Sequence, residues 1–133
     1  MTNLWQKLRR NLALAGLLAS GAMLASAAQF TGILMDVNNS ANAEERTESG
    51  GLLAGGLVVA EAYTKEDALK PESRKAGYGI FTEDNKFLAF DEEGNRKALV
   101  ALKSTRKEDD LRIEVTGEVK GSTIKVATLR LLP

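Results

Sequence analysis

The chain has 133 residues, and its 18 lysines and arginines balance its 18 aspartates and glutamates, so its formal net charge is zero. Proteins that bind nucleic acid usually carry a clustered basic excess, so this balance argues against a nucleic-acid partner. The sequence has no histidine and no cysteine, which excludes Ser–His and Cys–His nucleophile pairs and the usual zinc ligands. Paired carboxylates, as in glycosidases, are the remaining catalytic alternative. The acids cluster in predicted turns and linkers beside Lys or Arg, so we expect no enzymatic activity, metal or cofactor.

The first 43 residues have the composition of an export signal. Residues 1–10 are basic, and residues 12–28 are apolar or small and uncharged. A basic start, an apolar run and a small-residue cleavage motif together are typical of a secretory signal peptide. The motif Ala41-Asn42-Ala43 predicts cleavage before Glu44, and Ala25-Ser26-Ala27 is a second candidate.

An uncleaved membrane anchor is the alternative for this segment. No charged residue interrupts the run from Leu12 to Met35, which is long enough to span a bilayer. The run is rich in Ala, Gly and Ser, which are weak membrane formers, so we favour cleavage. The pair Arg9-Arg10 matches a twin-arginine signal only in part. We expect an exported protein, periplasmic or extracellular, that contacts the membrane only through this segment if it is retained.

The rest of the chain divides into a polar linker, residues 44–51, and a domain, residues 52–133. The first predicted strand is residues 52–63, where Gly55-Gly56 allows a bend. The polar segment 64–76 follows. Thr64 with Asp67 resembles a helix N-terminal box, and Pro71 ends any helix there, so we expect one helical turn or an exposed loop.

Two predicted hairpins flank a predicted helix. Residues 77–82 and 86–90 form the first hairpin, and Asp84-Asn85 suits its tight turn. The helix is residues 95–103, capped by Asn95, because its apolar residues share one face. Residues 111–120 alternate apolar and polar, which predicts a strand with one buried face. The last strand changes apolar parity after Val126, which predicts a β-bulge near Ala127-Thr128.

The predicted order is three strands, a helix and two strands. A helix between the third and fourth of five strands is the arrangement of the OB-fold, a five-stranded Greek-key barrel. We therefore predict a mainly β fold: a small five-stranded OB-like barrel with one short helix between strands 3 and 4, preceded by an N-terminal signal or anchor helix. A small open α+β sheet with the helix on one face is the alternative.

Four stretches carry a likeness to known proteins: Gly56-Leu57-Val58, GIFTEDNKFLAF at 79–90, KALVAL at 97–102 and IEVTGEVKGSTIKVATL at 113–129. Through them, residues 55–132 resemble a loose class of small exported bacterial proteins with an OB-like domain. The resemblance implies the fold and export, and no particular function. Some proteins of this class carry Cys and His between their first two strands. Residues 60–79 have neither, so no metal or redox role is carried over.

A second and weaker resemblance, in IEVTGEV at 113–119, is to exported bacterial OB-fold stress proteins. It rests on fold residues and implies no site. The acidic turn segments 83–85 and 91–95 offer oxygen ligands for calcium, but the EF-hand spacing is absent and turn chemistry explains both segments. The other acids lie in predicted turns beside Lys or Arg, which indicates a solvated surface.

The predicted binding site lies around the polar loop between the first two strands. Tyr63 and Tyr78 flank this loop, and we expect them to line a pocket at the barrel mouth together with Lys65 and Arg74. The sequence thus favours a non-enzymatic binding domain whose partner is a small molecule, a peptide or an envelope component. The alternative is a membrane-tethered structural or interaction module with no ligand pocket.

Overall fold

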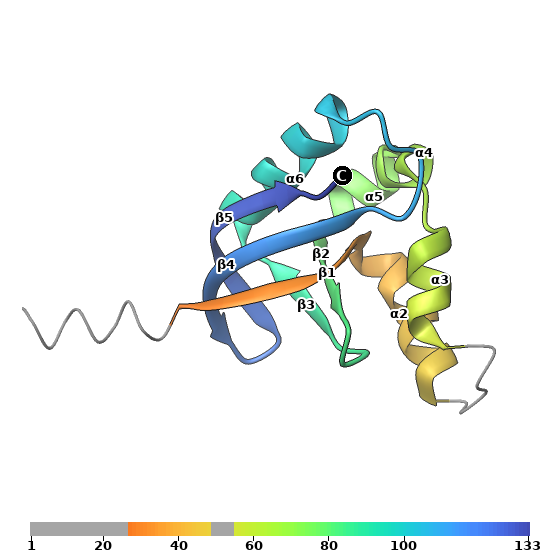
Figure 1. The fold of residues 1–133 in the computed structure, drawn as a ribbon, viewed down its shortest axis with the longest axis horizontal. Helices are drawn as coiled ribbons and strands as arrows, with labels where there is room; N and C mark the ends of the chain where they lie inside the picture. The colour runs from red at the N-terminus through yellow and green to blue at the C-terminus, as the bar shows by residue number, and fades with distance from the viewer. Residues whose placement is uncertain (1–26, 49–54) are drawn as a thin grey trace, which may run out of the picture.

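The computed structural model describes residues 27–48 and 55–133. It contains a mixed five-stranded sheet with several helices (Figure 1). The pairings run in the order β1-β2-β3-β5-β4, and β4 pairs again with β1, so the pairings form a ring. Only the β3–β5 pair is parallel. The strands are β1 (Ala28–Asp36), β2 (Tyr78–Thr82), β3 (Phe87–Phe90), β4 (Arg112–Lys120) and β5 (Thr123–Leu131).

Five helices lie in the part of the chain that the structure describes, where the sequence predicted one and a possible helical turn. Four of them form an insertion between β1 and β2, and the fifth lies between β3 and β4 (Figure 1). The insertion packs on the outer side of β1 and β2 through its first two helices. The helices are α2 (Val37–Glu48), α3 (Gly56–Ala62), α4 (Lys65–Ala68), α5 (Pro71–Ala76) and α6 (Glu92–Ser104).

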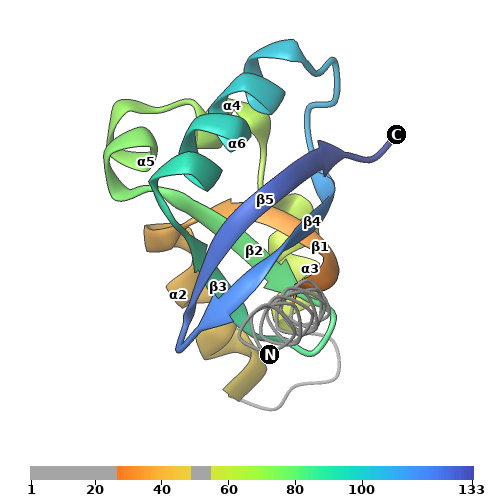
Figure 2. The same cartoon turned by 90° about the vertical axis from the view of Figure 1, so that its left-hand side faces the viewer.

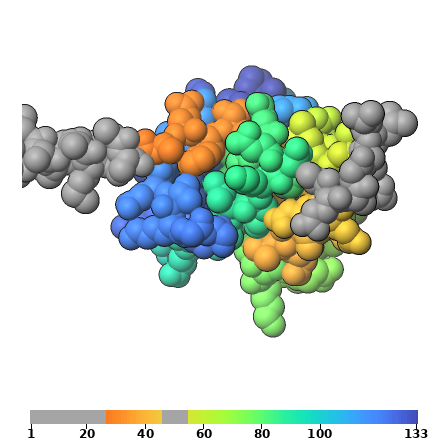
Figure 3. All heavy atoms as spheres, turned by 90° about the horizontal axis from the view of Figure 1, so that it is seen from below, coloured from red at the N-terminus to blue at the C-terminus, as the bar shows by residue number. Residues whose placement is uncertain are grey.

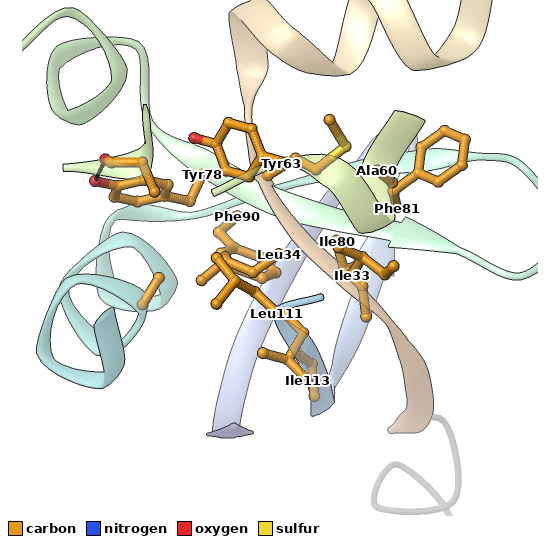
Figure 4. Packing of buried hydrophobic residues seen from close by; sticks show 14 of the residues in the cluster. Ile33, Leu34, Ala60, Tyr63, Tyr78, Ile80, Phe81, Phe90, Leu111 and Ile113 are labelled. Atoms are coloured by element: carbon orange, nitrogen blue, oxygen red, sulfur yellow. Dashed lines mark hydrogen bonds between the residues drawn. The ribbon is translucent and has the colours of Figure 1, made fainter. Parts of the chain in front are cut away.

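The core has two layers, on the inner and outer sides of the sheet. Strand register places Leu34 beside Ile80 on the inner side, and the opposite parity places Ile33 beside Phe81 on the outer side. All four side chains are fully buried. Figure 4 shows Phe81 on the side of Ala60, which belongs to α3. The helical insertion therefore buries the apolar outer face that β1 and β2 present.

The first predicted strand, residues 52–63, is wrong in its described part. Residues 56–62 form helix α3, and the first strand of the described residues is β1, which lies within the segment predicted to be an export signal. Gly56 and Ala60, four residues apart, are both buried on one face of α3, and α3 packs against α2 and β1. This packing outweighs the strand preference of Val58 and Val59. The sheet therefore includes residues 28–36, which lie before the predicted domain boundary, and residues 44–48 belong to α2 instead of a linker.

The position of β1 also changes the interpretation of the signal segment. Within the predicted anchor, residues 28–35 are strand, while residues 12–26 lie outside the described residues. Ala41, Ala43 and Glu44 lie in α2, and Ala43 is fully buried. Cleavage before Glu44 would remove a strand that supplies three fully or almost fully buried core residues. Of the helices within 27–48 and 55–133, none is long and apolar enough to cross a membrane.

The later elements follow the sequence prediction closely. Both hairpins form, and Asn85 takes a positive φ of 62° in the predicted turn. The β-bulge is confirmed, because Thr116 pairs with Thr128 and Gly117 with Val126, which leaves Ala127 without a partner position on β4. The helix begins three residues earlier than predicted. Asp91 caps it, with its Oδ1 accepting from Gly94 N at 3.0 Å.

The segment 64–76 contains two short helices and not one turn. Thr64 caps α4, since its Oγ1 accepts from Asp67 N at 3.1 Å. Pro71 stands at the first turn of α5, where its missing N–H costs nothing. Asn95, the predicted cap of the long helix, lies inside α6 and accepts from Tyr78 N at 2.8 Å. It thus joins α6 to the start of β2.

Candidate functional site

A groove lies between α6 and the second half of β5. Its volume is about 860 Å³. The two elements lie side by side in both cartoon views (Figure 2). One wall is the α6 face that carries Val100, Ala101 and Ser104, and the other is the continuous run from Ala127 to Pro133.

The edge of β5 that borders this groove is unpaired over most of its length. Strand β3 reaches β5 only at Thr123 and Ile124. Further along, Leu132 N donates to Arg112 O at 2.8 Å on the β4 side. Because backbone groups alternate sides along an antiparallel strand, those of Leu129 and Leu131 point away from β4. No strand within the described residues pairs with β5 there.

The bulge at Ala127 determines which side chains of β5 form the floor of the groove. After it, Leu129 lies opposite Val115 and Leu131 opposite Ile113, so the leucines return to the side of the sheet that faces the core. Both remain only partly buried. Without the extra residue, their side chains would point to the opposite side. The bulge thus gives this groove an apolar floor beside an open strand edge.

Val100 adds an exposed apolar side chain to the opposite wall. Ala98 and Leu102 bury the inner face of α6, whereas Val100 is 65% exposed. This is the highest value among the exposed large hydrophobic residues in the part of the chain that the structure describes. Its exposure is not required by the core, and single exposed valines are common. Val100 bears on the candidate site because it lies on the wall of the groove.

The rim of the groove is cationic. Its charged lining residues are Glu93 and four bases: Arg96, Lys97, Lys107 and Arg130. Arg96 pairs with Glu93 at 2.5 Å, and Arg130 pairs with Glu114 on β4 at 3.2 Å. Both arginine side chains are largely exposed, whereas Glu114 is 28% exposed. Ion pairs at such accessible positions contribute only about 0–1 kcal/mol. Lys97 also pairs with Glu93 at 3.5 Å, and Lys107 Nζ donates to Leu132 O at 3.4 Å. All four cations thus have partners within the protein, but such weak contacts can be exchanged for those of a negatively charged partner.

A buried carboxylate at the end of β1 forms a second polar centre. Asp36 is fully buried; its Oδ1 accepts from Asn39 N at 2.8 Å, and its Oδ2 accepts from Asn39 Nδ2 at 2.7 Å and Tyr63 Oη at 2.5 Å. Burial alone would raise the pKa of Asp36, but these hydrogen bonds outweigh it and lower the pKa below its ordinary value. Asp36 thus caps α2 as an ion.

Tyr63, in turn, is held protonated. Burial and the neighbouring Asp36 carboxylate both raise the pKa of Tyr63 well above its ordinary value. The hydroxyl is thus a fixed donor, and both carboxylate oxygens already have donors. No solute can approach the fully buried Asp36. The arrangement joins the helical insertion to the sheet, and we assign it a structural role.

The structure does not bring the four predicted ligand-binding residues around one cavity. Tyr63 and Tyr78 are core residues, 5% and 2% exposed, and Tyr78 Oη donates to Ala68 O at 2.6 Å (Figure 4). Lys65 Nζ donates to Thr105 O at 2.9 Å, and Arg74 is exposed on α5. Only Tyr63 lines the small cavity nearby, whose volume is about 160 Å³. Their binding role stays a prediction.

The opposite end of the ring of strands, away from α6, carries another hollow, of about 530 Å³. There the start of β1 meets the β2–β3 and β4–β5 hairpins (Figure 3). Phe30, Leu88 and Val119 supply its apolar part. It is smaller than the groove beside β5. Its rim mixes two acids with one lysine, so it favours neither a cationic nor an anionic partner strongly.

The acidic turns take part in structural contacts. Asp91 Oδ1 accepts from Gly94 N and, at 3.2 Å, from Val126 N, so this carboxylate joins α6 to β5. Residues 83–85 form the turn between β2 and β3. Within 27–48 and 55–133, no group of three or more acids is placed to hold a metal ion.

Comparisons of the chain with protein-family models, with curated proteins and with solved structures find no match. The assignment of the groove as the candidate site therefore depends on its geometry alone. Sequence reasoning identified two of its signals, the parity change after Val126 and the helix, but did not connect them. A third signal was Val100, which lies off the buried face of that helix.

Proposed function

We propose that this protein is an exported, non-enzymatic OB-like domain that binds an extended polypeptide segment of an envelope component. The binding surface is the groove between α6 and β5. The observation that carries the proposal is the unpaired edge of β5 beyond Val126, beside a partly exposed apolar floor. Extended peptides bind at such edges by adding a strand, with main-chain hydrogen bonds giving affinity and side-chain pockets giving specificity.

The ring of strands supports the OB-like part of the proposal. Five strands in the order β1-β2-β3-β5-β4, with a helix between β3 and β4, correspond to a partly open Greek-key barrel. OB-folds commonly bind ligands on the β2–β3 face. Here helices α2 and α3 of the chain's own insertion pack on the sheet around β1 and β2. Because these helices occupy part of the sheet that OB-folds commonly use, we place the binding surface beside β5 instead.

The start of β1 supports export with a different cleavage site. The motif Ala25-Ser26-Ala27 directly precedes Ala28, the first residue of β1. Cleavage after Ala27 would release an intact domain, whereas cleavage before Glu44 would remove β1. We therefore place the mature N-terminus at Ala28. The resemblance to small exported bacterial OB-like proteins agrees with this assignment.

N-terminal mass analysis of the protein from fractionated cells tests the export proposal. We expect a chain that begins at Ala28 in the extracytoplasmic fraction. An intact Met1 in the membrane fraction would favour the alternative, a tethered interaction module. Full-length chain in the cytosol would contradict export.

Selection from a library of displayed random peptides, each about ten residues long, tests the binding proposal without assuming a sequence. The folded protein is the target, and selected peptides are measured against two matched variants. Val100→Glu places a charge in the groove, and Val58→Glu places one at the other strongly exposed valine, on α3. We expect Val100→Glu to weaken binding at least about tenfold, because apolar burial is lost, and Val58→Glu to leave it unchanged. Equal effects, or an absence of selected peptides, would contradict the proposal.

A further inference from the structure

We infer that the partner segment is acidic and that it adds to the sheet as a sixth strand along β5. This inference rests on the proposed function, because it specifies the chemistry of the segment that occupies the same groove. Two independent features carry it: the direction of the backbone groups of β5 and the sign of the charges around the groove.

The backbone of β5 fixes how the segment binds. The N–H and C=O groups of Leu129 and Leu131 point away from β4, so each leucine offers one donor and one acceptor to a new strand. An added strand of about five residues, at about 3.3 Å per residue, is long enough to pair with the open edge around Leu129 and Leu131. Its alternate side chains then point toward the apolar floor and toward the rim.

The charges around the groove fix the sign of the partner. The four bases that line it exceed the single acid, Glu93, by three side-chain charges. Arg130 stands directly on β5 with 69% of its side chain exposed, and Arg96 on α6 has 65% exposed. Glutamates or aspartates at the rim-facing positions of an added strand would therefore meet cations. Lysines there would meet like charge, which destabilises strand pairs.

The same charges argue against two other occupants. A second copy that paired through its own β5 would bring two cationic rims together. The basic start of this chain, with Lys7, Arg9 and Arg10, carries the same sign as the groove. Single-stranded nucleic acid would find no stacking surface, because none of the groove's lining residues is aromatic. An acidic polypeptide is the occupant that fits both features.

Binding of three synthetic peptides, and of an N-methylated version of one of them, to the folded chain tests the inference. The first probe alternates valine and glutamate over eight residues, and its two matched probes carry glutamine or lysine in place of glutamate. A further version of the acidic probe is N-methylated at alternate residues, which removes the N–H groups needed for strand pairing. Fluorescence anisotropy gives Kd at low and physiological salt.

We expect the glutamate probe to bind about fivefold to tenfold more tightly than the glutamine probe, and the lysine probe to bind most weakly. Salt should weaken the glutamate probe alone, since exposed charges are screened. The double variant Arg96→Gln/Lys107→Gln removes two of the four bases and should reduce the preference for glutamate. The matched variant Arg74→Gln/Lys75→Gln, on α5, should keep it. N-methylation should abolish binding.

Equal affinity for the glutamate and glutamine probes would overturn the acidic preference. Unchanged binding of the N-methylated probe would overturn strand addition. Failure of all three probes would overturn the inference as a whole. None of these results contradicts the proposed function if peptides from the unbiased selection still lose affinity with Val100→Glu. Loss of that dependence contradicts the proposed function itself.

Discussion

Tyr63 and Asp36, which are 27 positions apart, meet in a buried hydrogen bond of 2.5 Å from the tyrosine hydroxyl to Oδ2 of the aspartate. Asp36 is the last residue of β1, and Tyr63 directly follows α3. The bond thus closes the helical insertion onto the strand from which it leaves. Asn39 binds the same carboxylate from α2, so one ion holds both helices against the sheet.

Replacing Tyr63 with phenylalanine should destabilise the protein by about 2 kcal/mol, because a buried charged acceptor loses a donor. Tyr78→Phe is the matched control. Its hydroxyl donates to a neutral carbonyl, that of Ala68, so we expect a loss of only about 1 kcal/mol. Urea unfolding followed by circular dichroism measures both. A cost for Tyr63→Phe no larger than that for Tyr78→Phe would show that the carboxylate is not the special partner.

The lowered pKa of Asp36 predicts acid sensitivity. The folded state holds this carboxyl below its ordinary value of 3.8, so its stabilising effect is complete above that pH. As the pH falls below about 4 and through the folded pKa, the carboxylate is protonated and that stability is lost. Free energies of unfolding measured between pH 7 and pH 2 should show this fall. Asp36→Asn should be less stable at pH 7 and should show a shallower decline. An identical decline in both proteins would assign the acid sensitivity to other groups.

Gly94 lies where α6 packs against Val126 of β5, so a side chain at this position should clash with that valine. A Cβ at this position would lie 2.5 Å from Val126 Cγ2 and 2.7 Å from Phe90 Cβ. Gly94→Ala should therefore cost about 1–3 kcal/mol through overpacking, despite the better helix propensity of alanine. Val126→Ala should relieve part of the clash. The double variant should be less destabilised than the sum of the two single variants, and strict additivity in thermal melts would contradict the packing.

The place of β1 in the sheet predicts where the folded domain begins. A chain of residues 28–133 should melt cooperatively, close to the full-length protein. A chain of residues 44–133 should not, because it lacks the fully buried Ile33 and Leu34 and exposes the facing sides of β2 and β4. Circular dichroism melts compare the two. Equal cooperative melting would restore the domain boundary predicted from the sequence.

Much of the fold could be predicted from the sequence because local signals agreed with the tertiary structure. The alternation in 111–120 and the parity change after Val126 gave the last hairpin and its bulge. The β1 strand was missed because its apolar residues directly follow the apolar run of the N-terminal segment. The strand preference of Val58 and Val59 hid helix α3, whose formation depends on packing against α2 and β1.

The candidate site was less predictable than the fold. Tyr63 and Tyr78 flank a polar segment, as ligand-binding aromatics often do, but both are buried with their hydroxyls bonded inside the protein. The groove forms between residues about 30 positions apart, Val100 and Leu131, and depends on β3 leaving β5 after two residue pairs. Neither the length of that pairing nor the angle of α6 is encoded in a local pattern.

The location of binding is tested most directly by amide chemical-shift mapping of the folded protein with a peptide from the unbiased selection. We predict that the largest shift changes occur along β5 from Thr128 to Leu131 and in α6 around Val100 and Ser104. Residues at the opposite end of the ring, such as Phe30 and Leu88, should stay unchanged. Shift changes centred on that end, or on the segment around Tyr63, with β5 unaffected, would contradict a binding groove between α6 and β5.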